Sequence, residues 1–180
     1  NVTERHRMGA LDVKEEIIVD AFAGIGYYSL PLLVHGKAAH VHACELNPES
    51  IKALQWAAQK NEVSQSITIH KGDNQTTLPA LNRVADRVLL GLLPSSEAAW
   101  KLAVLALKEQ GGSMHIHMNV EEEHIEKWTE DTIQTCLNYA REDGRDWYCN
   151  HQHLEKVKWY APRVRHVVLD VSFSSSNSAS

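Results

Sequence analysis

The sequence has few cysteines and no long hydrophobic run, and each absence excludes a class of protein. Its three cysteines, Cys44, Cys136 and Cys149, are too few and too scattered for a disulfide framework or a C-x-x-C zinc ribbon. No stretch approaches the roughly 20 apolar residues of a membrane-spanning helix, and no signal peptide opens the chain. We therefore expect free, buried thiols in a soluble, cytoplasmic protein.

The chain also lacks an excess of positive charge. It carries 18 Lys and Arg against 23 Asp and Glu, a formal net charge of −5, so it has no overall electrostatic attraction for nucleic acid. With 180 residues, 43% of them hydrophobic, it fits one globular domain. Because it starts at Asn1 rather than Met, we expect a piece of a longer protein, in which another region assists any binding of nucleic acid.

Apolar runs of strand length alternate with helical patterns, which indicates βαβ units and a mostly parallel sheet covered on both faces. We expect five parallel strands, at residues 16–21, 39–45, 66–71, 86–90 and 113–118. Two further strands, 153–160 and 163–173, predict an antiparallel hairpin joined at Ala161-Pro162. This inventory predicts an α/β, Rossmann-like fold of the class I S-adenosylmethionine-dependent methyltransferase type, a mostly parallel seven-stranded sheet with a terminal antiparallel hairpin.

Three helices are expected between these strands. One follows Asn47-Pro48 and runs to about Asn61, with an inner stripe of Ile51, Leu54, Ala57 and Ala58. The others cover residues 95–109, ended by Gly111-Gly112, and 121–141. We expect one domain at residues 1–173 and a disordered Ser/Asn/Ala tail at 174–180.

The loop after the first strand carries the strongest binding signal. In open parallel sheets, ligands bind beyond the carboxyl ends of the strands. Here Asp20 ends the strand, Ala23 follows, and Gly24 and Gly26 permit a tight turn and a close approach of ligand to backbone. Ser29 stands where a dinucleotide fingerprint has its third glycine, so a nucleoside without phosphates is favoured and a nicotinamide oxidoreductase is disfavoured.

Acidic and amide residues follow the next two strands. Glu45 comes 19 residues after Gly26, the distance at which a strand-end carboxylate reaches ribose hydroxyls; the alternative is a carboxylate that caps the following helix. After the third strand, Asp73 and Asn74 stand where an adenine ring would lie, with a plain Gly-Asp-Asn turn as the alternative.

The loop at 91–97 and the histidines are the remaining candidates. Ser95 or Ser96 can cap the next helix, and the loop lacks the Asn/Asp-Pro-Pro-aromatic signature of base-amine methyltransferases. His115, His117 and Asn119 share one strand face, as do Cys149, His151 and His153, but neither set completes a metal shell, so no metal is expected. We expect His117 and Asn119 to line a substrate pocket and His115 to pack in the core.

Taken together and in order, these motifs resemble the tRNA wybutosine-synthesising aminocarboxypropyltransferases, whose near relatives are the tRNA guanine-N1 methyltransferases of the anticodon loop. The matching segments are residues 1–5, 20–27, 42–48, 72–74, 91–97, 115–117 and 160–164. The Gly-Leu-Leu-Pro-Ser-Ser-Glu loop and the His-Ile-His strand are their most specific parts. Leu92 stands two residues before Pro94, where the methyltransferase relatives carry Asn, and this favours the aminocarboxypropyl branch.

The resemblance implies transfer of the 3-amino-3-carboxypropyl group of S-adenosylmethionine to a carbon of the tricyclic wyosine precursor in phenylalanine tRNA. The cofactor-binding candidates are Arg5, Asp20, Ala23, Gly24, Gly26, Glu45, Asp73, Asn74 and Leu92. The catalytic candidates are His117, Asp73, Pro94 and Ser95. Arg5 is expected to hold the cofactor's carboxylate. The tRNA-binding region that precedes this domain in the family is expected to lie outside the chain.

Two alternatives stay open. The first is a tRNA purine methyltransferase that uses the same cofactor. The second is a non-catalytic nucleoside-binding or tRNA-docking module.

Overall fold

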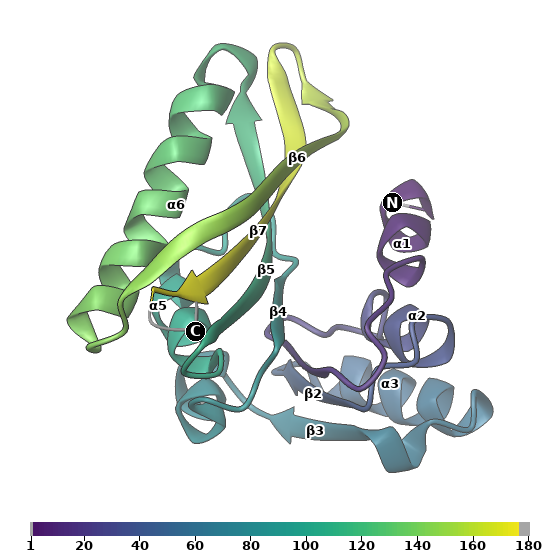
Figure 1. Cartoon of the computed structure of the whole chain (residues 1–180). Helices are drawn as coiled ribbons and strands as arrows, with labels where there is room; N and C mark the ends of the chain where they lie inside the picture. Colours follow the sequence, from purple (N-terminus) through teal and green to yellow (C-terminus); the bar gives the residue numbers. More distant parts are fainter. Residues whose placement is uncertain (1, 177–180) are drawn as a thin grey trace.

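The structure is a computed structural model that describes residues 2–176, arranged as one seven-stranded sheet with helices on both faces (Figure 1). The strands are β1 (Ile17–Asp20), β2 (His40–Glu45), β3 (Ile67–Lys71), β4 (Arg87–Leu90), β5 (Gly111–Glu121), β6 (Trp147–Ala161) and β7 (Val164–Ser175). The α-helices are α1 (Val2–Gly9), α2 (Ser29–Val34), α3 (Pro48–Lys60), α4 (Asn74–Thr77), α5 (Trp100–Ala106) and α6 (Ile125–Glu142). Single 3-10 turns are η1 (Ser64–Ser66), η2 (Leu78–Leu81), η3 (Glu97–Ala99) and η4 (Glu122–His124).

The strand order is β3-β2-β1-β4-β5-β7-β6. Strands β1 to β5 are parallel, while β7 runs antiparallel between β5 and β6. The predicted fold class is therefore confirmed. The chain moves outward from β1 to β3 in one direction and from β4 to β5 in the other, so the order reverses between β1 and β4. Ligands of open α/β sheets bind beyond the strand ends at such a reversal.

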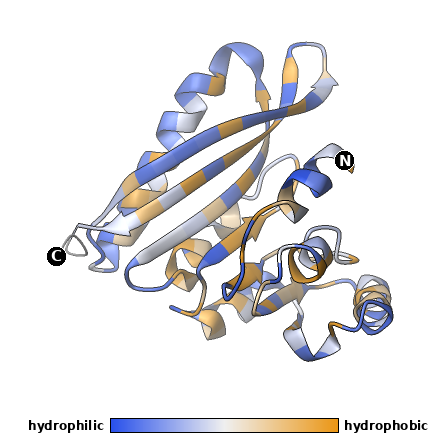
Figure 2. Cartoon of the chain, turned by 45° about the vertical axis from the view of Figure 1, so that its right-hand side comes forward, coloured by the Kyte–Doolittle hydropathy of each residue, from blue (hydrophilic) through white to orange (hydrophobic). Residues whose placement is uncertain are grey.

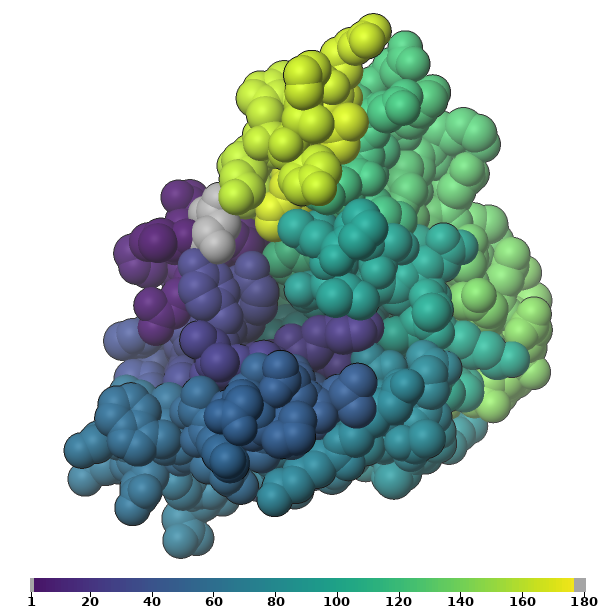
Figure 3. Space-filling view, turned by 180° about the vertical axis from the view of Figure 1, so that it is seen from behind, coloured from purple at the N-terminus to yellow at the C-terminus, as the bar shows by residue number. Residues whose placement is uncertain are grey.

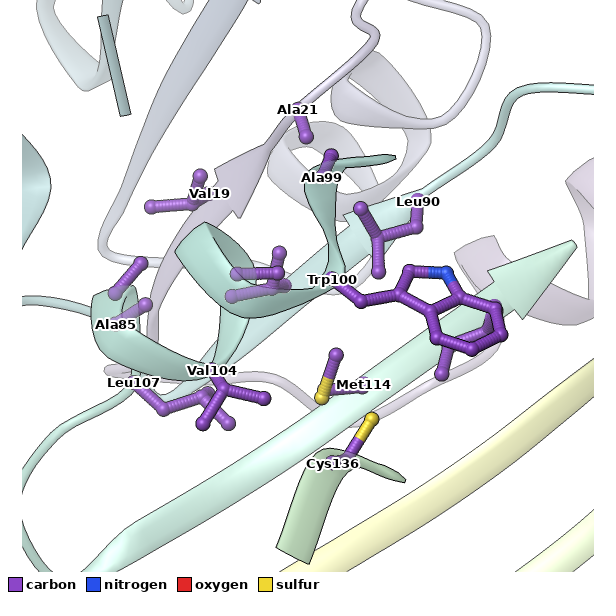
Figure 4. Packing of buried hydrophobic residues seen from close by; sticks show 14 of the residues in the cluster. Val19, Ala21, Ala85, Leu90, Ala99, Trp100, Val104, Leu107, Met114 and Cys136 are labelled. Carbon is purple, nitrogen blue, oxygen red and sulfur yellow. The ribbon is translucent and has the colours of Figure 1, made fainter. Parts of the chain in front are cut away.

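The hydrophobic core lies on both faces of the sheet. Beneath α5 and α6, Trp100, Met114 and Cys136 meet from a helix, a strand and a second helix (Figure 4). A second cluster packs β1 and β2 against α1, α2 and α3. Figure 2 shows the hydrophobic residues gathered in the central strands and hydrophilic ones along α6. Cys44 and Cys136 are buried free thiols as expected, whereas Cys149 is half-buried.

The helix after β2 forms for the reasons that its sequence suggests. The side chain of Asn47 caps α3 by accepting a hydrogen bond from the Glu49 N–H at 2.9 Å, and Pro48 occupies the first helical position. Ile51 and Leu54 are buried, as is Ala58, but Ala57 of the expected stripe is only half-buried.

Several expected element boundaries are wrong, and strand pairing explains most of them. Strand β5 pairs with β7 along its whole length, so it is longer than the expected 113–118, and the next helix begins at Ile125 rather than 121. Helix α5 ends at Ala106, so the glycine pair opens β5 instead of ending a helix. At Gly111 (φ 109°) a Cβ would lie 2.2 Å from the Phe173 carbonyl oxygen, and this close approach of β7 requires glycine.

The end of the expected domain is also corrected. Strand β7 continues to Ser175 because Ser174 pairs with Gly111, so the expected tail contributes two residues to the sheet. Residues 177–180 of that tail lie outside the described residues. Within residues 2–176, no helix combines the length and the apolar character needed to cross a bilayer.

A series of hydrogen-bonded polar and charged side chains fastens α1 to the sheet. It consists of Glu4, Arg7, Asp170, His115, Arg87 and Glu16. Arg7 bridges to Asp170 at 2.5 Å, and Asp170 contacts His115 Nδ1 at 2.7 Å. Because the Arg87 guanidinium only donates, His115 Nε2 accepts from it and Nδ1–H donates to Asp170. Burial opposes ionisation of Asp170, but the hydrogen bonds from His115 and Arg7 hold its pKa below the usual range. His115 therefore links charges instead of only packing.

Candidate active site

The loops at the carboxyl ends of β1, β2, β3 and β4 surround a cavity of about 360 Å³, here called the strand-end cavity. Its walls come from four separate loops, as the fold class predicts. They are formed by Ala21, Phe22, Gly24, Cys44, Glu45, Leu46, Gly72, Asp73, Asn74, Gly91 and Leu92. Five of the nine cofactor-binding candidates are thereby brought together: Gly24, Glu45, Asp73, Asn74 and Leu92.

The glycine loop after β1 depends on left-handed backbone. Gly24 has φ 57° and Gly26 has φ 95°. A Cβ on Gly26 would lie 2.7 Å from Leu54 Cδ1, so packing against α3 also requires glycine there. Ala23 is held by a 3.0 Å hydrogen bond from its N–H to the Cys44 carbonyl. The sequence pattern correctly indicated a tight turn close to the cavity.

Glu45 holds two loops with one carboxylate. Its Oε1 accepts from the Gly24 N–H at 2.8 Å, and its Oε2 accepts from the Asn47 N–H at 2.8 Å. A carboxylate has about four lone-pair positions, so roughly two remain for a ligand in the cavity. The α3 cap is the Asn47 side chain, so the alternative reading of Glu45 as the helix cap does not describe this structure.

Asp73 and Asn74 combine a turn role with a place in the cavity wall. Asp73 Oδ1 caps α4 by accepting a hydrogen bond from the Gln75 N–H at 2.8 Å. This contact is the one that the alternative, a plain Gly-Asp-Asn turn, predicts. Asn74 Nδ2 donates to the Ala21 carbonyl at 3.1 Å and ties this loop to the end of β1. Both residues nevertheless line the strand-end cavity.

Asp20 lies behind the glycine loop, not in a cavity wall. It is 1% exposed, accepts from Ser29 Oγ at 2.7 Å and accepts from the Phe22 N–H at 3.3 Å. Burial raises its pKa to about 6, against the effect of the hydrogen bond from Ser29. Asp20 and Ser29 therefore fix the loop to the start of α2 from behind.

The loop after β4 divides its residues between wall and support. Leu92 lines the strand-end cavity and Leu93 lines a neighbouring cavity, whereas neither wall includes Pro94 or Ser95. Ser95 Oγ accepts from the Glu97 N–H at 3.1 Å, and the Pro94 carbonyl accepts from the Asn119 N–H at 3.0 Å. The structure thus gives Pro94 and Ser95 supporting contacts within the loop and places neither of them in the wall of these two cavities.

The neighbouring cavity, of about 380 Å³, adjoins the strand-end cavity by sharing Phe22, Gly24 and Gly91. We call it the histidine cavity. Its other lining residues are Ala23, Ile25, Tyr27, Tyr28, Leu93, His117, Lys158 and His166. His117 therefore occupies the predicted kind of position, whereas Asn119 lies outside this wall.

The two histidines of this cavity contact each other. His117 Nδ1 lies 2.9 Å from His166 Nε2, and the His117 ring lies 5.4 Å from the Tyr28 ring, centroid to centroid. Burial is the main cause that lowers the pKa of His117 to about 3 and that of His166 to about 4. Both rings are accordingly neutral near pH 7 and offer hydrogen bonds without charge.

Arg5 does not line either cavity. Its guanidinium lies 5.6 Å from the centroid of the Tyr27 ring, which is part of the histidine-cavity wall. Arg5 is exposed on α1, so it stands next to the site behind an aromatic ring.

Sequence reasoning missed Tyr28, Lys158 and His166 as cavity residues. Tyr28 stands two residues after Gly26, so the glycine-loop pattern could have predicted its place in the cavity wall. His166 and Lys158 lie on the hairpin, and only the pairing of β7 with β5 and β6 brings them to this wall.

The strand order and the cavity at its reversal define the class I S-adenosylmethionine-dependent methyltransferase fold. A family model for the TRM5/TYW2 methyltransferase domain matches residues 1–145. The chain therefore belongs to the TRM5/TYW2 methyltransferase domain family.

Named relatives agree with this assignment. The chain is 48% identical over 171 residues to "tRNA wybutosine-synthesizing protein 2/3/4" of Arabidopsis thaliana, covering 95% of this chain but only 17% of that protein. The structure of M. jannaschii TYW2 in complex with AdoMet matches with a TM-score of 0.87 and 31% identity, over 97% of this chain and 76% of that one. The structure of P. horikoshii TYW2 in complex with MeSAdo matches with a TM-score of 0.84 and 34% identity, over 98% of this chain and 63% of that one.

Proposed function

We propose that the protein carrying this chain transfers the 3-amino-3-carboxypropyl group of S-adenosylmethionine to a carbon of the tricyclic wyosine precursor in phenylalanine tRNA. The observation that carries the proposal is the pair of adjoining cavities that share Phe22, Gly24 and Gly91. One suits a nucleoside donor, and the other has room and aromatic walls for a planar base. The names of the Arabidopsis relative and of the two TYW2 structures, with AdoMet and MeSAdo, support the same reaction.

The donor's adenosine occupies the strand-end cavity in this proposal. Glu45 accepts hydrogen bonds from the ribose hydroxyls, which its remaining lone pairs allow. Asp73 and Asn74 contact the polar edge of the adenine, and Leu92 packs on its face. Gly24 lies in both cavity walls, so the donor's sulfur is placed beside it, where the two cavities meet.

Orientation of the donor selects the transferred group. The sulfonium activates three carbons, and the one held in line with the nucleophile at near-attack distance reacts. Here the acceptor carbon supplies an electron pair to the donor carbon that joins the amino-acid arm to sulfur. The bond from that carbon to sulfur breaks, sulfur keeps the electron pair, and methylthioadenosine leaves. The acceptor carbon then loses its proton to water, and the ring regains its aromatic bonding.

The catalytic candidates take different parts in this scheme. His117 is a poor proton acceptor at neutral pH because its pKa is lowered to about 3, chiefly by burial. We assign it to hydrogen bonding of the acceptor base in the histidine cavity. Asp73 lines the strand-end cavity and serves the donor. Pro94 and Ser95 serve the shape of the loop that carries Leu92 and Leu93.

We assign residues 2–175 to the donor-binding catalytic domain and propose that a region outside this chain contributes to tRNA binding. The formal charge of −5 supports this separation of donor binding from tRNA binding, because binding of RNA phosphates calls for an excess of Lys and Arg.

The test is to identify the by-product when the full-length protein meets S-adenosylmethionine and tRNA carrying the wyosine precursor. The proposal expects methylthioadenosine, together with an aminocarboxypropyl group on the tRNA. S-adenosylhomocysteine would refute it in favour of methyl transfer. Binding of the donor without any turnover would refute it in favour of a non-catalytic module.

A further inference from the structure

Among its described lining residues, the histidine cavity contains one charged side chain, that of Lys158. His117 and His166 are neutral near pH 7, for the reasons given above. The other walls are glycine, alanine, aliphatic or aromatic residues. Besides burial, the nearby ammonium of Lys158 contributes to the lowered pKa of His166, which agrees with its position in this wall. An otherwise uncharged cavity thus has a cation on its hairpin side.

A β-bulge aims Lys158 at the cavity. Lys156 is opposite Val167 and Lys158 is opposite His166, with a register shift between the two pairs. Directly opposed residues share a face of the sheet, and consecutive residues such as His166 and Val167 point to opposite faces. Lys156 and Lys158 therefore point to opposite faces, although their spacing of two would place them together in a regular strand. Bulges are known to redirect a side chain beside a functional site.

The two lysines also differ in their partners. Lys156 Nζ forms an ion pair with Glu122 at 2.8 Å, and the same carboxylate receives Arg165 at 2.9 Å. Lys158 has no ion pair with any carboxylate in residues 2–176 and is exposed. The hairpin therefore neutralises one of these cations internally and leaves the other, beside His166, available to a ligand.

Resting on the proposed function for the identity of the ligand, we propose that Lys158 is the anion-binding residue of the histidine cavity. Figure 3 shows the yellow-green hairpin standing over the surface built from early (purple) and central (teal) parts of the chain.

The anion can come from either reactant. The transferred arm of the donor carries a carboxylate, and the nucleotide that presents the acceptor base carries a phosphate. An ammonium group binds both as a mobile point charge. Arg5, which the sequence suggested for the carboxylate, stands behind the Tyr27 ring, whereas Lys158 lines the cavity itself.

The experiment compares Lys158→Met with Lys158→Arg and with the matched control Lys156→Met in the full-length protein. Two affinities are measured: S-adenosylmethionine without RNA, by calorimetry, and a phenylalanine-tRNA anticodon stem-loop, by fluorescence anisotropy at several salt concentrations. We expect Lys158→Met to weaken one of these two affinities about tenfold. This is the lower end of the range for losing a hydrogen bond to a charged group, because the Lys158 side chain is exposed. Lys158→Arg and Lys156→Met should stay within about twofold to threefold of wild type, because each keeps a cation at position 158.

The pattern of losses identifies the source of the anion. Weaker binding of S-adenosylmethionine identifies the donor's carboxylate as the anion that Lys158 binds. Weaker RNA binding, with the slope of log Kd against log salt concentration smaller by about 0.7 to 0.9, assigns one phosphate contact. Unchanged values for both ligands overturn the role of Lys158, as does an equal loss in Lys156→Met. If the wild-type protein binds neither ligand, the proposed function itself fails, so the two failures are distinct.

Discussion

Replacing Glu45 is the most direct perturbation of the proposed donor site. In the free protein its carboxylate accepts two 2.8 Å hydrogen bonds, from the N–H groups of Gly24 and Asn47. In the proposed complex it also accepts from the ribose. Glu45→Ala should therefore remove the ribose contact and loosen the loop that carries Gly24. A hydrogen bond to a charged group contributes about 1.5–3 kcal/mol, so donor affinity should fall roughly tenfold to 150-fold.

The assay is calorimetric titration with S-adenosylmethionine, alongside urea unfolding of each variant. Glu49→Ala is the matched control, because Glu49 lies in the first turn of α3 and its side chain is 81% exposed in a 3.3 Å ion pair with Lys52. Glu45→Gln should be intermediate, because the amide keeps one acceptor oxygen but turns a donor toward a backbone N–H. A dissociation constant for Glu45→Ala equal to that of wild type would refute the placement of the ribose.

Two further predictions concern the glycine loop and its support. Because the pKa of Asp20 is raised to about 6 by burial, above an unfolded value near 3.9, its ionisation should remove stability as pH rises through this interval. Asp20→Asn should therefore gain up to about 3 kcal/mol relative to wild type between pH 4 and pH 7 in urea unfolding; a pH-independent difference would contradict this. Gly26→Ala should lower the free energy of unfolding by roughly 2–4 kcal/mol, because φ is 95° and the new Cβ meets Leu54 at 2.7 Å. Gly144→Ala, with φ 78° and no atom within 4 Å of the Cβ, should cost only the backbone strain of about 1–2 kcal/mol, and equal losses would show that packing is not the cause.

The sequence determined the class of fold and much of the strand-end cavity. Alternation of strand and helix patterns fixes a parallel sheet, and a parallel sheet brings the ends of successive strands to one edge. Residues at strand ends or in the loops that follow them, such as Gly24, Glu45 and Asp73, are therefore placed by local sequence order alone. Their spacing predicts that they lie together, and the structure does bring them to one cavity.

The sequence predicted less well which loop residues are buried and which form supporting hydrogen bonds. Asp20 ends β1 and Ser95 lies in the loop after β4, but the first is buried against Ser29 and the second accepts a hydrogen bond from the Glu97 N–H. A sequence pattern gives the position of a residue along the chain, and it does not say which side of a loop its side chain takes. That choice depends on which polar groups need a hydrogen-bond partner once the loop is packed.

The histidine cavity was decided by tertiary structure. His117 and His166 are 49 residues apart in the chain and meet only because β7 inserts antiparallel between β5 and β6. Lys158 faces them because a register shift reverses the alternation between Lys156 and Lys158. Side chains along a regular strand alternate between the two faces of the sheet, but a bulge shifts this alternation by one residue. The position of a bulge depends on how both strands pair. The strand-end cavity thus follows from local sequence order, whereas the histidine cavity forms only once β7 pairs between β5 and β6.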